Sequence, residues 1–195
     1  MLDRRVVGTG TVVPQVLWVP HTVTDRKHHV ENAKLQMPIF FLHTDGRLGL
    51  TLEAAVSGRC HTLLNSQFSA PVGNQTTTHI RIGVSSQCFR RFPITDDSVT
   101  FIQWRGYREF KRQVQIRDET TQRNTVTLLK FAQHVGRSVE AFLKSANAKV
   151  DFENQLPQWR VGEGGIQPHE IMVIGAIQVS CGGWTPILQL TRYIF

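Results

Sequence analysis

A single amphipathic run between residues 127 and 144 constrains the fold of this chain more than any other stretch. It reads "TLLKFAQHVGRSVEAFLK", and its apolar side chains recur every three or four residues, which places them along one face of a helix. Thr127 can cap this helix by accepting a hydrogen bond from an amide of the first turn. Because a helix with one apolar face has to cover another element, and extended segments lie on both sides of the run, the sequence predicts a helix packed on a β-sheet.

Alternating segments predict strands of that sheet. Ile80, Ile82 and Val84 alternate with polar residues, and so do Val114 and Ile116. A period of two is typical of strands that bury one face and expose the other. We therefore expect the basic and polar residues between them to point to solvent.

Asp45-Gly46 predicts a hairpin near the N-terminal third of the chain. This dipeptide tolerates the positive φ angles of a tight turn, and it lies between two apolar runs at 39–42 and 48–52. A short helix that ends at Gly58 is expected to follow.

The last quarter predicts two further strands. The segment at 171–181, "IMVIGAIQVSC", is almost continuously apolar, which is typical of a central strand buried on both faces. The glycine-rich segment at 182–186 is expected to turn the chain. A final strand is then expected over 187–195, "ILQLTRYIF", with an edge free to pair with a second copy of the chain.

The length and composition fit one domain of ordinary size. The chain has 195 residues, of which 41% are apolar and 19% charged, so it can bury a core without disulfides or metals. No repeat or linker divides it. We therefore expect residues 1–195 to form a single α+β domain, in which a mostly antiparallel or mixed β-sheet packs against one main helix at about 127–144.

The cysteines and the apolar runs indicate where such a chain works. Three cysteines are too few for a disulfide framework, and an odd number fits reduced thiols in the cytoplasm or nucleus. No apolar run approaches the length of a membrane span. We expect a soluble intracellular protein that does not contact a membrane.

No motif in the sequence predicts a catalytic residue, a cofactor or a metal site. The glycine-rich "RVGEGGIQ" has Gln167 where a dinucleotide-binding loop needs glycine. Cys181 is not followed directly by the tryptophan of papain-like enzymes, because Gly182 and Gly183 intervene. The histidines show no metal-ligand spacing. An enzyme with an unrecognised site therefore ranks as the third hypothesis.

Several stretches resemble an uncharacterised protein family of mushroom-forming (basidiomycete) fungi. They are the Trp-x-Gly-Tyr frame at 104–107, "RQVQIRDET" at 112–120, "RNTVTLLKFAQHVG" at 123–136 and the Phe-Leu pair at 142–143. Members often read Trp-Pro-Gly-Tyr, where this chain has arginine in place of proline. The resemblance covers roughly residues 38–190 and implies no known activity, ligand or catalytic residue.

The chain departs from the pattern of that family just before the Trp-x-Gly-Tyr frame. In the family, the preceding strand tends to run straight into this frame, whereas here "SSQCFRRFPITDDSVTF" intervenes. We therefore expect residues 85–97 to form an inserted loop, which carries Arg90 and Arg91.

Positive charge is concentrated in one part of the chain. Of the formal net charge of +7, residues 101–150 contribute +6, because they contain ten Lys and Arg against four Asp and Glu. Aromatic side chains lie between the basic ones here and could stack on nucleic-acid bases. The candidate binding residues are Arg90, Arg91, Trp104, Arg105, Tyr107, Arg108, Lys111, Arg112 and Arg117.

Two hypotheses account for this basic segment. The first is a non-enzymatic binding or self-assembling protein, whose partner is another protein or a second copy of the chain. The alternative is a nucleic-acid-binding module that uses the basic and aromatic residues between 90 and 117, although no known nucleic-acid-binding motif is present.

Overall fold

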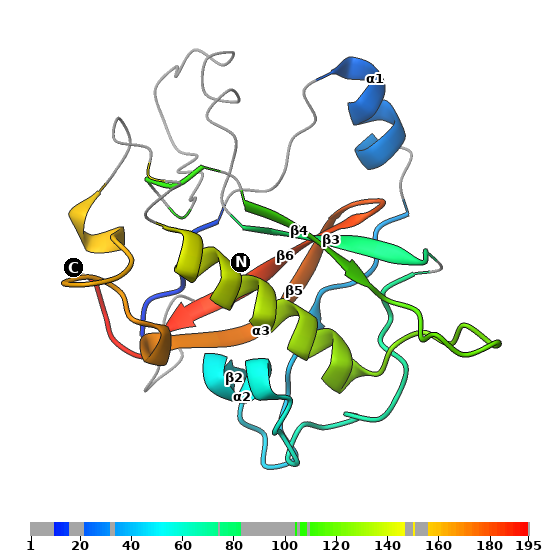
Figure 1. The fold of residues 1–195 in the computed structure, drawn as a ribbon, viewed down its shortest axis with the longest axis horizontal. Helices are drawn as coiled ribbons and strands as arrows, with labels where there is room; N and C mark the ends of the chain where they lie inside the picture. Colours follow the sequence, from blue (N-terminus) through cyan, green and yellow to red (C-terminus); the bar gives the residue numbers. More distant parts are fainter. Residues whose placement is uncertain are drawn as a thin grey trace.

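A mixed β-sheet with a long helix lying across one face forms the centre of the molecule (Figure 1). The computed structural model describes residues 10–15, 22–31, 34–73, 75–82, 104, 106–108, 110–146, 150 and 156–194. The strands are β1 (Ile39–Phe40), β2 (Leu50–Thr51), β3 (Thr77–Ile82), β4 (Phe110–Gln115), β5 (Ile171–Ser180) and β6 (Gly183–Leu190). The helical elements are α1 (Val23–Arg26), η1 (Lys27–Glu31), α2 (Leu52–Ser57), α3 (Leu128–Ser145), η4 (Pro157–Trp159) and η5 (Pro168–Glu170). The predicted α+β class, with one main helix, is confirmed.

The sheet has the strand order β1-β5-β6-β3-β4, and β2 also pairs with β5. All these pairs are antiparallel except β3 with β6, which run parallel. β5 therefore lies inside the sheet, as its continuous apolar sequence predicts, whereas β4 forms one end of the strand order.

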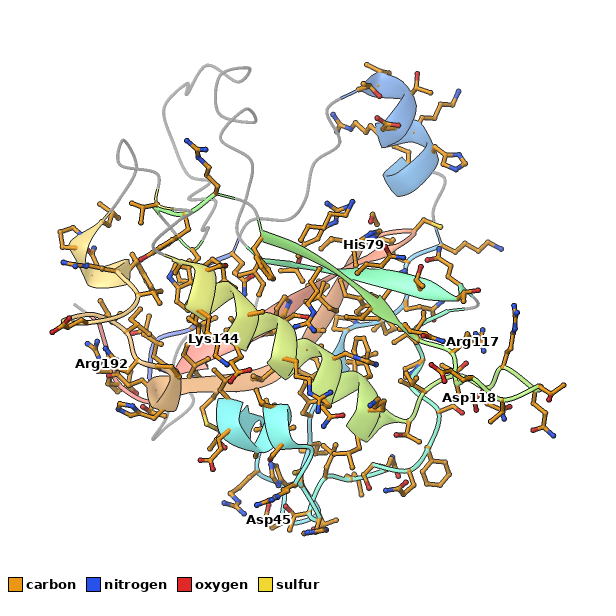
Figure 2. The ribbon with its side chains drawn as sticks, in the orientation of Figure 1. Asp45, His79, Arg117, Asp118, Lys144 and Arg192 are labelled. Carbon is orange, nitrogen blue, oxygen red and sulfur yellow. The ribbon has the colours of Figure 1, made fainter. Side chains whose placement is uncertain are left out.

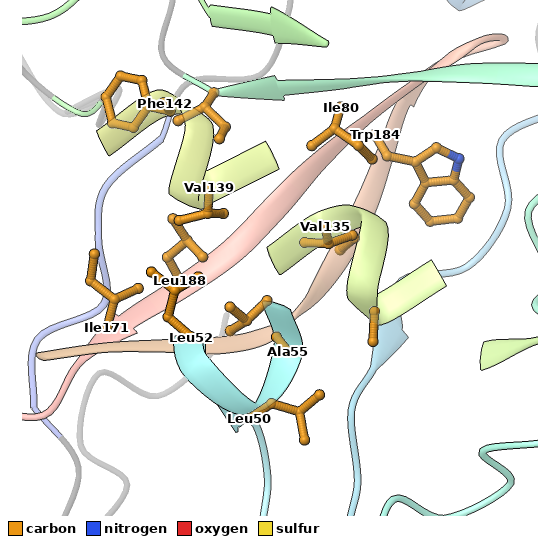
Figure 3. Close-up of a cluster of buried hydrophobic side chains, with 14 of the residues drawn as sticks. Leu50, Leu52, Ala55, Ile80, Val135, Val139, Phe142, Ile171, Trp184 and Leu188 are labelled. Atoms are coloured by element: carbon orange, nitrogen blue, oxygen red, sulfur yellow. The ribbon is translucent and has the colours of Figure 1, made fainter. Parts of the chain in front are cut away.

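The helix α3 begins and packs as its sequence predicts. The Thr127 side chain accepts a hydrogen bond from the Lys130 amide at 3.2 Å, which satisfies one of the free amides of the first turn. The apolar stripe of the helix is buried against the sheet, and Figure 3 shows Val135, Val139 and Phe142 among the side chains of β3, β5 and β6. This contact fixes which face of the sheet is covered.

A close contact between α2 and α3 requires glycine on α3. A Cβ atom built on Gly136 would lie 2.7 Å from the Cβ of Ala55. Since real Cβ atoms do not approach this closely, Gly136 and Ala55 together allow the two helices to touch. The predicted short helix is α2, and Gly58 ends it with a φ of 71°.

The hairpin at Asp45-Gly46 forms, but most of its flanking residues pair with β5 rather than with each other. Leu42 and Leu48 form an antiparallel bridge across the turn. Beyond this bridge, β1 and β2 lie end to end along the same edge of β5. Against the central strand, one side of each apolar run is buried, including Ile39 and Leu50, whereas Phe40 and Leu48 stay exposed.

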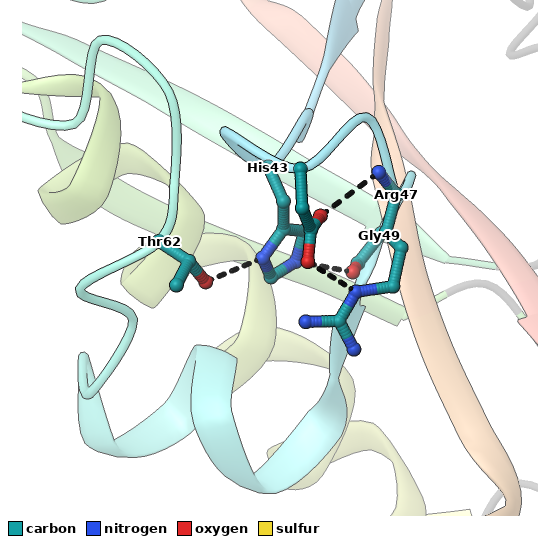
Figure 4. Close-up of polar contacts among 5 residues, drawn as sticks. His43, Arg47, Gly49 and Thr62 are labelled. Carbon is teal, nitrogen blue, oxygen red and sulfur yellow. Dashed lines mark hydrogen bonds and ion pairs between the residues drawn. The ribbon is translucent and has the colours of Figure 1, made fainter.

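The His43 side chain stabilises this hairpin. Its Nδ1 lies 2.6 Å from the Thr62 hydroxyl and its Nε2 lies 2.9 Å from the Gly49 carbonyl oxygen, so the ring connects the turn to the chain beyond α2 (Figure 4). Asp45 accepts hydrogen bonds from the backbone and side chain of Arg47, and these bonds lower the pKa of its carboxyl group. The polar groups of the loop are therefore used by the fold.

The prediction for the C-terminal strand is wrong at both ends and in its surroundings, and β6 stops at Leu190 instead of continuing through 191–194. β6 begins at Gly183, so Trp184 and Pro186 belong to the strand and the turn is reduced to Cys181 and Gly182. β6 has β5 along one edge. Its other edge pairs with β3 and, further along, with residues 11–13, through amide bonds such as Val13 to the Leu188 carbonyl at 2.8 Å. β6 consequently offers no free edge to a second copy of the chain.

Among the described residues, no helix has the length and apolar character needed to cross a lipid bilayer.

Candidate binding surface at β4

The two faces of the β3–β4 pair can be assigned from one aromatic contact. The ring of Trp184 lies 5.4 Å from that of Phe131 on α3, so Trp184 is on the helix-covered face of the sheet. Ile80 is the cross-strand partner of Trp184 and also of Arg112. Residues that are paired directly across neighbouring strands point to the same face of the sheet, so Ile80 and Arg112 point to the face covered by α3. Because side chains alternate along a strand, the residues next to them in sequence point to the opposite, outer face.

The outer face of β3 and β4 is polar and basic. Arg81 lies opposite Lys111, and His79 lies opposite Gln113. The pKa of His79 is lowered, mainly by burial and next by the positive charge of Lys111. The side chains of this face therefore produce a positive potential with no described carboxylate among them.

The helix-covered face becomes basic where it reaches the edge of the sheet. The Arg112 side chain is exposed and donates from Nη1 to the Arg137 carbonyl of α3 at 2.9 Å. Burial lowers the pKa of the half-buried His134 to about 4, and the charges of Lys130, Arg137 and Arg112 contribute further. His134 is therefore neutral at neutral pH and lies within a cluster of cations.

These two groups of residues flank the same strand on both faces. We call them together the basic β4 surface, which consists of His79, Arg81, Lys111, Arg112, Lys130, His134 and Arg137. The described ion pairs involve other basic residues, and Lys111, Arg112 and Arg137 form none with a described carboxylate. Their charges are available to an acidic partner.

Trp104 and Tyr107, which were predicted to bind, belong to the core. Trp104 is 0% exposed and Tyr107 is 2% exposed. The Trp104 Nε1 donates to the Trp159 carbonyl at 3.0 Å, and the Tyr107 hydroxyl accepts from the Val161 amide at 2.7 Å. Both rings also pack on Phe142, with centroids 5.2 and 5.7 Å away. Neither ring presents a face on which a nucleic-acid base could stack, and this corrects their assignment as binding residues.

Arg117 also has a structural task. Its guanidinium donates to the carbonyl oxygens of Gln75 at 3.3 Å and Gly73 at 3.2 Å, and to the Thr125 hydroxyl. Figure 2 shows Arg117 where β4 continues into the hairpin that carries Asp118. The side chain therefore fastens this hairpin to the segment before β3, which limits its use in binding.

The other predicted residues divide into exposed residues and residues outside the described part. Arg108, Lys111 and Arg112 are exposed, as expected. Arg90, Arg91 and Arg105 lie outside the described residues, as does the expected inserted loop at 85–97.

A polar hollow of about 190 Å³ lies beside the hairpin after β4. Asp118 contributes to its wall, but one carboxylate oxygen already accepts hydrogen bonds from the Thr120 hydroxyl at 2.6 Å and the Asn124 amide at 2.9 Å. The Thr120 hydroxyl bond is the main cause of the lowered pKa of Asp118. This carboxylate holds the turn together, so the hollow is explained by hairpin structure rather than by chemistry.

A larger apolar hollow of about 480 Å³ lies near the start of α3. Met37 and Phe68 contribute to its wall and are 82% and 70% exposed, respectively. Its lining contains no titratable side chain. It can bury an apolar group but provides no acid or base. In the described ranges, no group of three or more His, Cys, Asp or Glu side chains is placed to hold a metal ion.

The sequence interpretation missed the contribution of α3 and β3 to the basic β4 surface. Lys130 and Arg137 are visible in the sequence as the polar side of the helix, and Arg81 as an outward residue of a strand. Their proximity to Lys111 and Arg112 depends on strand order and register, which local patterns do not determine.

Comparisons of the chain with protein-family models, with curated proteins and with solved structures find no match.

Proposed function

We propose that this protein is a non-enzymatic binding protein whose basic β4 surface contacts an acidic segment of a protein partner. The observation that carries the proposal is the presence of cations on both faces of an exposed strand at the end of the sheet, with Lys111 on one face and Arg112 on the other. Such a surface attracts acidic groups and repels basic ones, which gives both affinity and selectivity.

A protein partner is favoured over the alternative, a nucleic acid. Binding to single strands normally combines phosphate contacts with stacking on exposed aromatic rings. Trp104 and Tyr107 are buried, so the β4 region retains its cations but loses the two rings that suggested stacking. Self-assembly through the C-terminal strand loses support as well, because both edges of β6 are occupied. We keep the relationship to the fungal family as a proposal about ancestry, and it contributes nothing to the proposed function.

The test is a binding titration with a fluorescein-labelled acidic peptide, followed by fluorescence anisotropy. We expect the double substitution Lys111→Glu and Arg112→Glu to weaken binding by about tenfold or more, since it replaces attraction by repulsion on both faces. Lys34→Glu with Arg59→Glu is the matched control, because it changes the net charge equally at exposed positions outside the surface. Equal binding by both double variants would refute the proposal, and so would tight binding of a single-stranded oligonucleotide of equal charge with no binding of the peptide.

A further inference from the structure

The strand β4 has a free edge in the part of the chain that the structure describes. It is the last strand in the sheet order, and its pairing with β3 is the only strand pairing found for it among the described residues. Lys111, Arg112, Gln113 and Gln115 are all exposed. Along this edge a strand keeps a row of amide and carbonyl groups without partners in the sheet.

The hydrogen bonds of the neighbouring residues show which backbone groups face outward. The Ile116 amide donates to the Thr76 carbonyl on the β3 side at 3.0 Å. Because these directions alternate in an antiparallel pair, Arg112 and Val114 also point their backbone groups toward β3. The amides and carbonyls of Lys111, Gln113 and Gln115 consequently point away from the sheet.

We propose that the partner's acidic segment binds by adding a strand to this edge of β4. The inference rests on the proposed function and adds to it the mode of recognition. Backbone hydrogen bonds to Lys111, Gln113 and Gln115 provide affinity, and side chains on the two faces provide specificity. The segment that fits is extended, with acidic residues opposite Lys111 and Arg112 and with hydrogen-bonding polar residues opposite Gln113 and Gln115.

The charges on the edge select against a second copy of the same strand. If the β4 edges of two copies paired, Lys111 and Arg112 of one copy would lie close to the same two residues of the other. Like charges on paired strands destabilise the pairing. Basic residues on edge strands protect proteins from unspecific pairing. On β4, Lys111 and Arg112 disfavour a second basic strand, and an acidic strand is the partner with complementary charge.

The experiment compares two substitutions of Gln113 in the complete chain. Gln113→Pro removes an outward-facing amide and places a ring on the free edge, and it leaves the hydrogen bonds from β4 to β3 in place because the Gln113 amide does not take part in them. Gln113→Ala is the matched control, since it removes the same side chain, including its bond to the Thr77 hydroxyl at 3.1 Å, and keeps the amide. The probe is a labelled peptide of about eight residues with adjacent Glu and Asp followed by alternating Thr and Val.

We expect Gln113→Ala to bind the peptide within about twofold of the original chain and Gln113→Pro to bind at least about tenfold more weakly. Equal binding by Gln113→Pro and Gln113→Ala would overturn strand addition, whereas the proposed function would still stand if Lys111→Glu with Arg112→Glu abolished binding. Amide hydrogen exchange gives a second test that needs no variant. The peptide should slow exchange at Lys111, Gln113 and Gln115, and bound protein with unchanged exchange at these three amides would also overturn the inference.

Discussion

Replacing Phe142 by alanine should be among the most destabilising single substitutions in this chain. The side chain is 0% exposed, and three aromatic rings surround it at centroid distances of 5.2 Å (Trp104), 5.7 Å (Tyr107) and 6.0 Å (Phe110). Truncating a buried phenylalanine typically costs about 3 to 5 kcal/mol. Aromatic pairs contribute about 0.5 to 1.5 kcal/mol each beyond the buried area, so we expect a loss toward the upper end, near 5 kcal/mol. That is a large part of the total stability of about 5 to 15 kcal/mol of a typical domain.

Urea unfolding followed by tryptophan fluorescence and circular dichroism measures this loss. Phe142→Leu keeps most of the volume but no ring, and we expect it to cost on the order of 1 to 2 kcal/mol. Lys144→Ala controls for the position on the helix, since it removes only an exposed ion pair with Glu140, and should change stability by less than about 1 kcal/mol. A loss below about 1 kcal/mol for Phe142→Ala, or equal losses for Ala and Leu, would refute the packing of the rings around Phe142.

Three further predictions test other parts of the fold. The folded-state pKa of His134 is about 4, below the unfolded value of 6.5, so the unfolded chain binds more protons between these pH values and stability should fall as the pH drops through this window. Urea unfolding at pH 7.5 and at pH 4.5 measures this fall in the free energy of unfolding. After allowing for solvent screening of this half-buried ring, we expect the fall to be about 1 to 2 kcal/mol smaller in His134→Gln than in the original chain. Gly136→Ala should destabilise by up to about 2 kcal/mol, because overpacking against Ala55 exceeds the gain in helix propensity, and adding Ala55→Gly should recover part of the loss in thermal melts. Arg117→Lys should cost about 1 to 3 kcal/mol in the same melts, since an ammonium group cannot reach both backbone carbonyls and the Thr125 hydroxyl; an unchanged midpoint would contradict the structural role of Arg117.

Local periodicity was enough to predict the elements that pack on one another. The stripe of α3 and its Thr127 cap depend on residues three or four positions apart, and the alternation around Ile80 and Val114 depends on residues two apart. These spacings determine which side chains share a face, whatever the rest of the chain does. The same local reasoning placed β5 inside the sheet, since a strand with no polar face must be covered on both sides.

The place of each strand in the sheet depends on contacts that are distant in sequence. The segment 182–186 contains Gly182, Gly183 and Pro186, which favour a turn locally, yet the Trp184 ring packs on Phe131 of α3 and the Trp184 backbone lies between β3 and β5. Burial of that ring outweighs the local preference. Trp104 shows the same limitation, because an aromatic residue beside arginines can stack on a ligand or enter the core, and only the fold distinguishes these cases.

The packing around Phe142 connects the core to the proposed binding edge. Phe110, at the first position of β4, contacts Phe142, and the next two residues, Lys111 and Arg112, carry the charges of the edge. The aromatic residues of this basic segment therefore hold the strand against the helix. Lys111 stays at the surface because it points to the outer face of the sheet, and Arg112 stays exposed because the helix-covered face ends at this edge. Interleaving of the two residue types suits the proposed role of this edge strand, since the aromatic residues anchor the strand and the basic residues would select the segment that pairs with it. The pattern that first suggests a nucleic-acid clamp is thus accounted for by a sheet edge with a buried anchor and a charged, hydrogen-bonding rim.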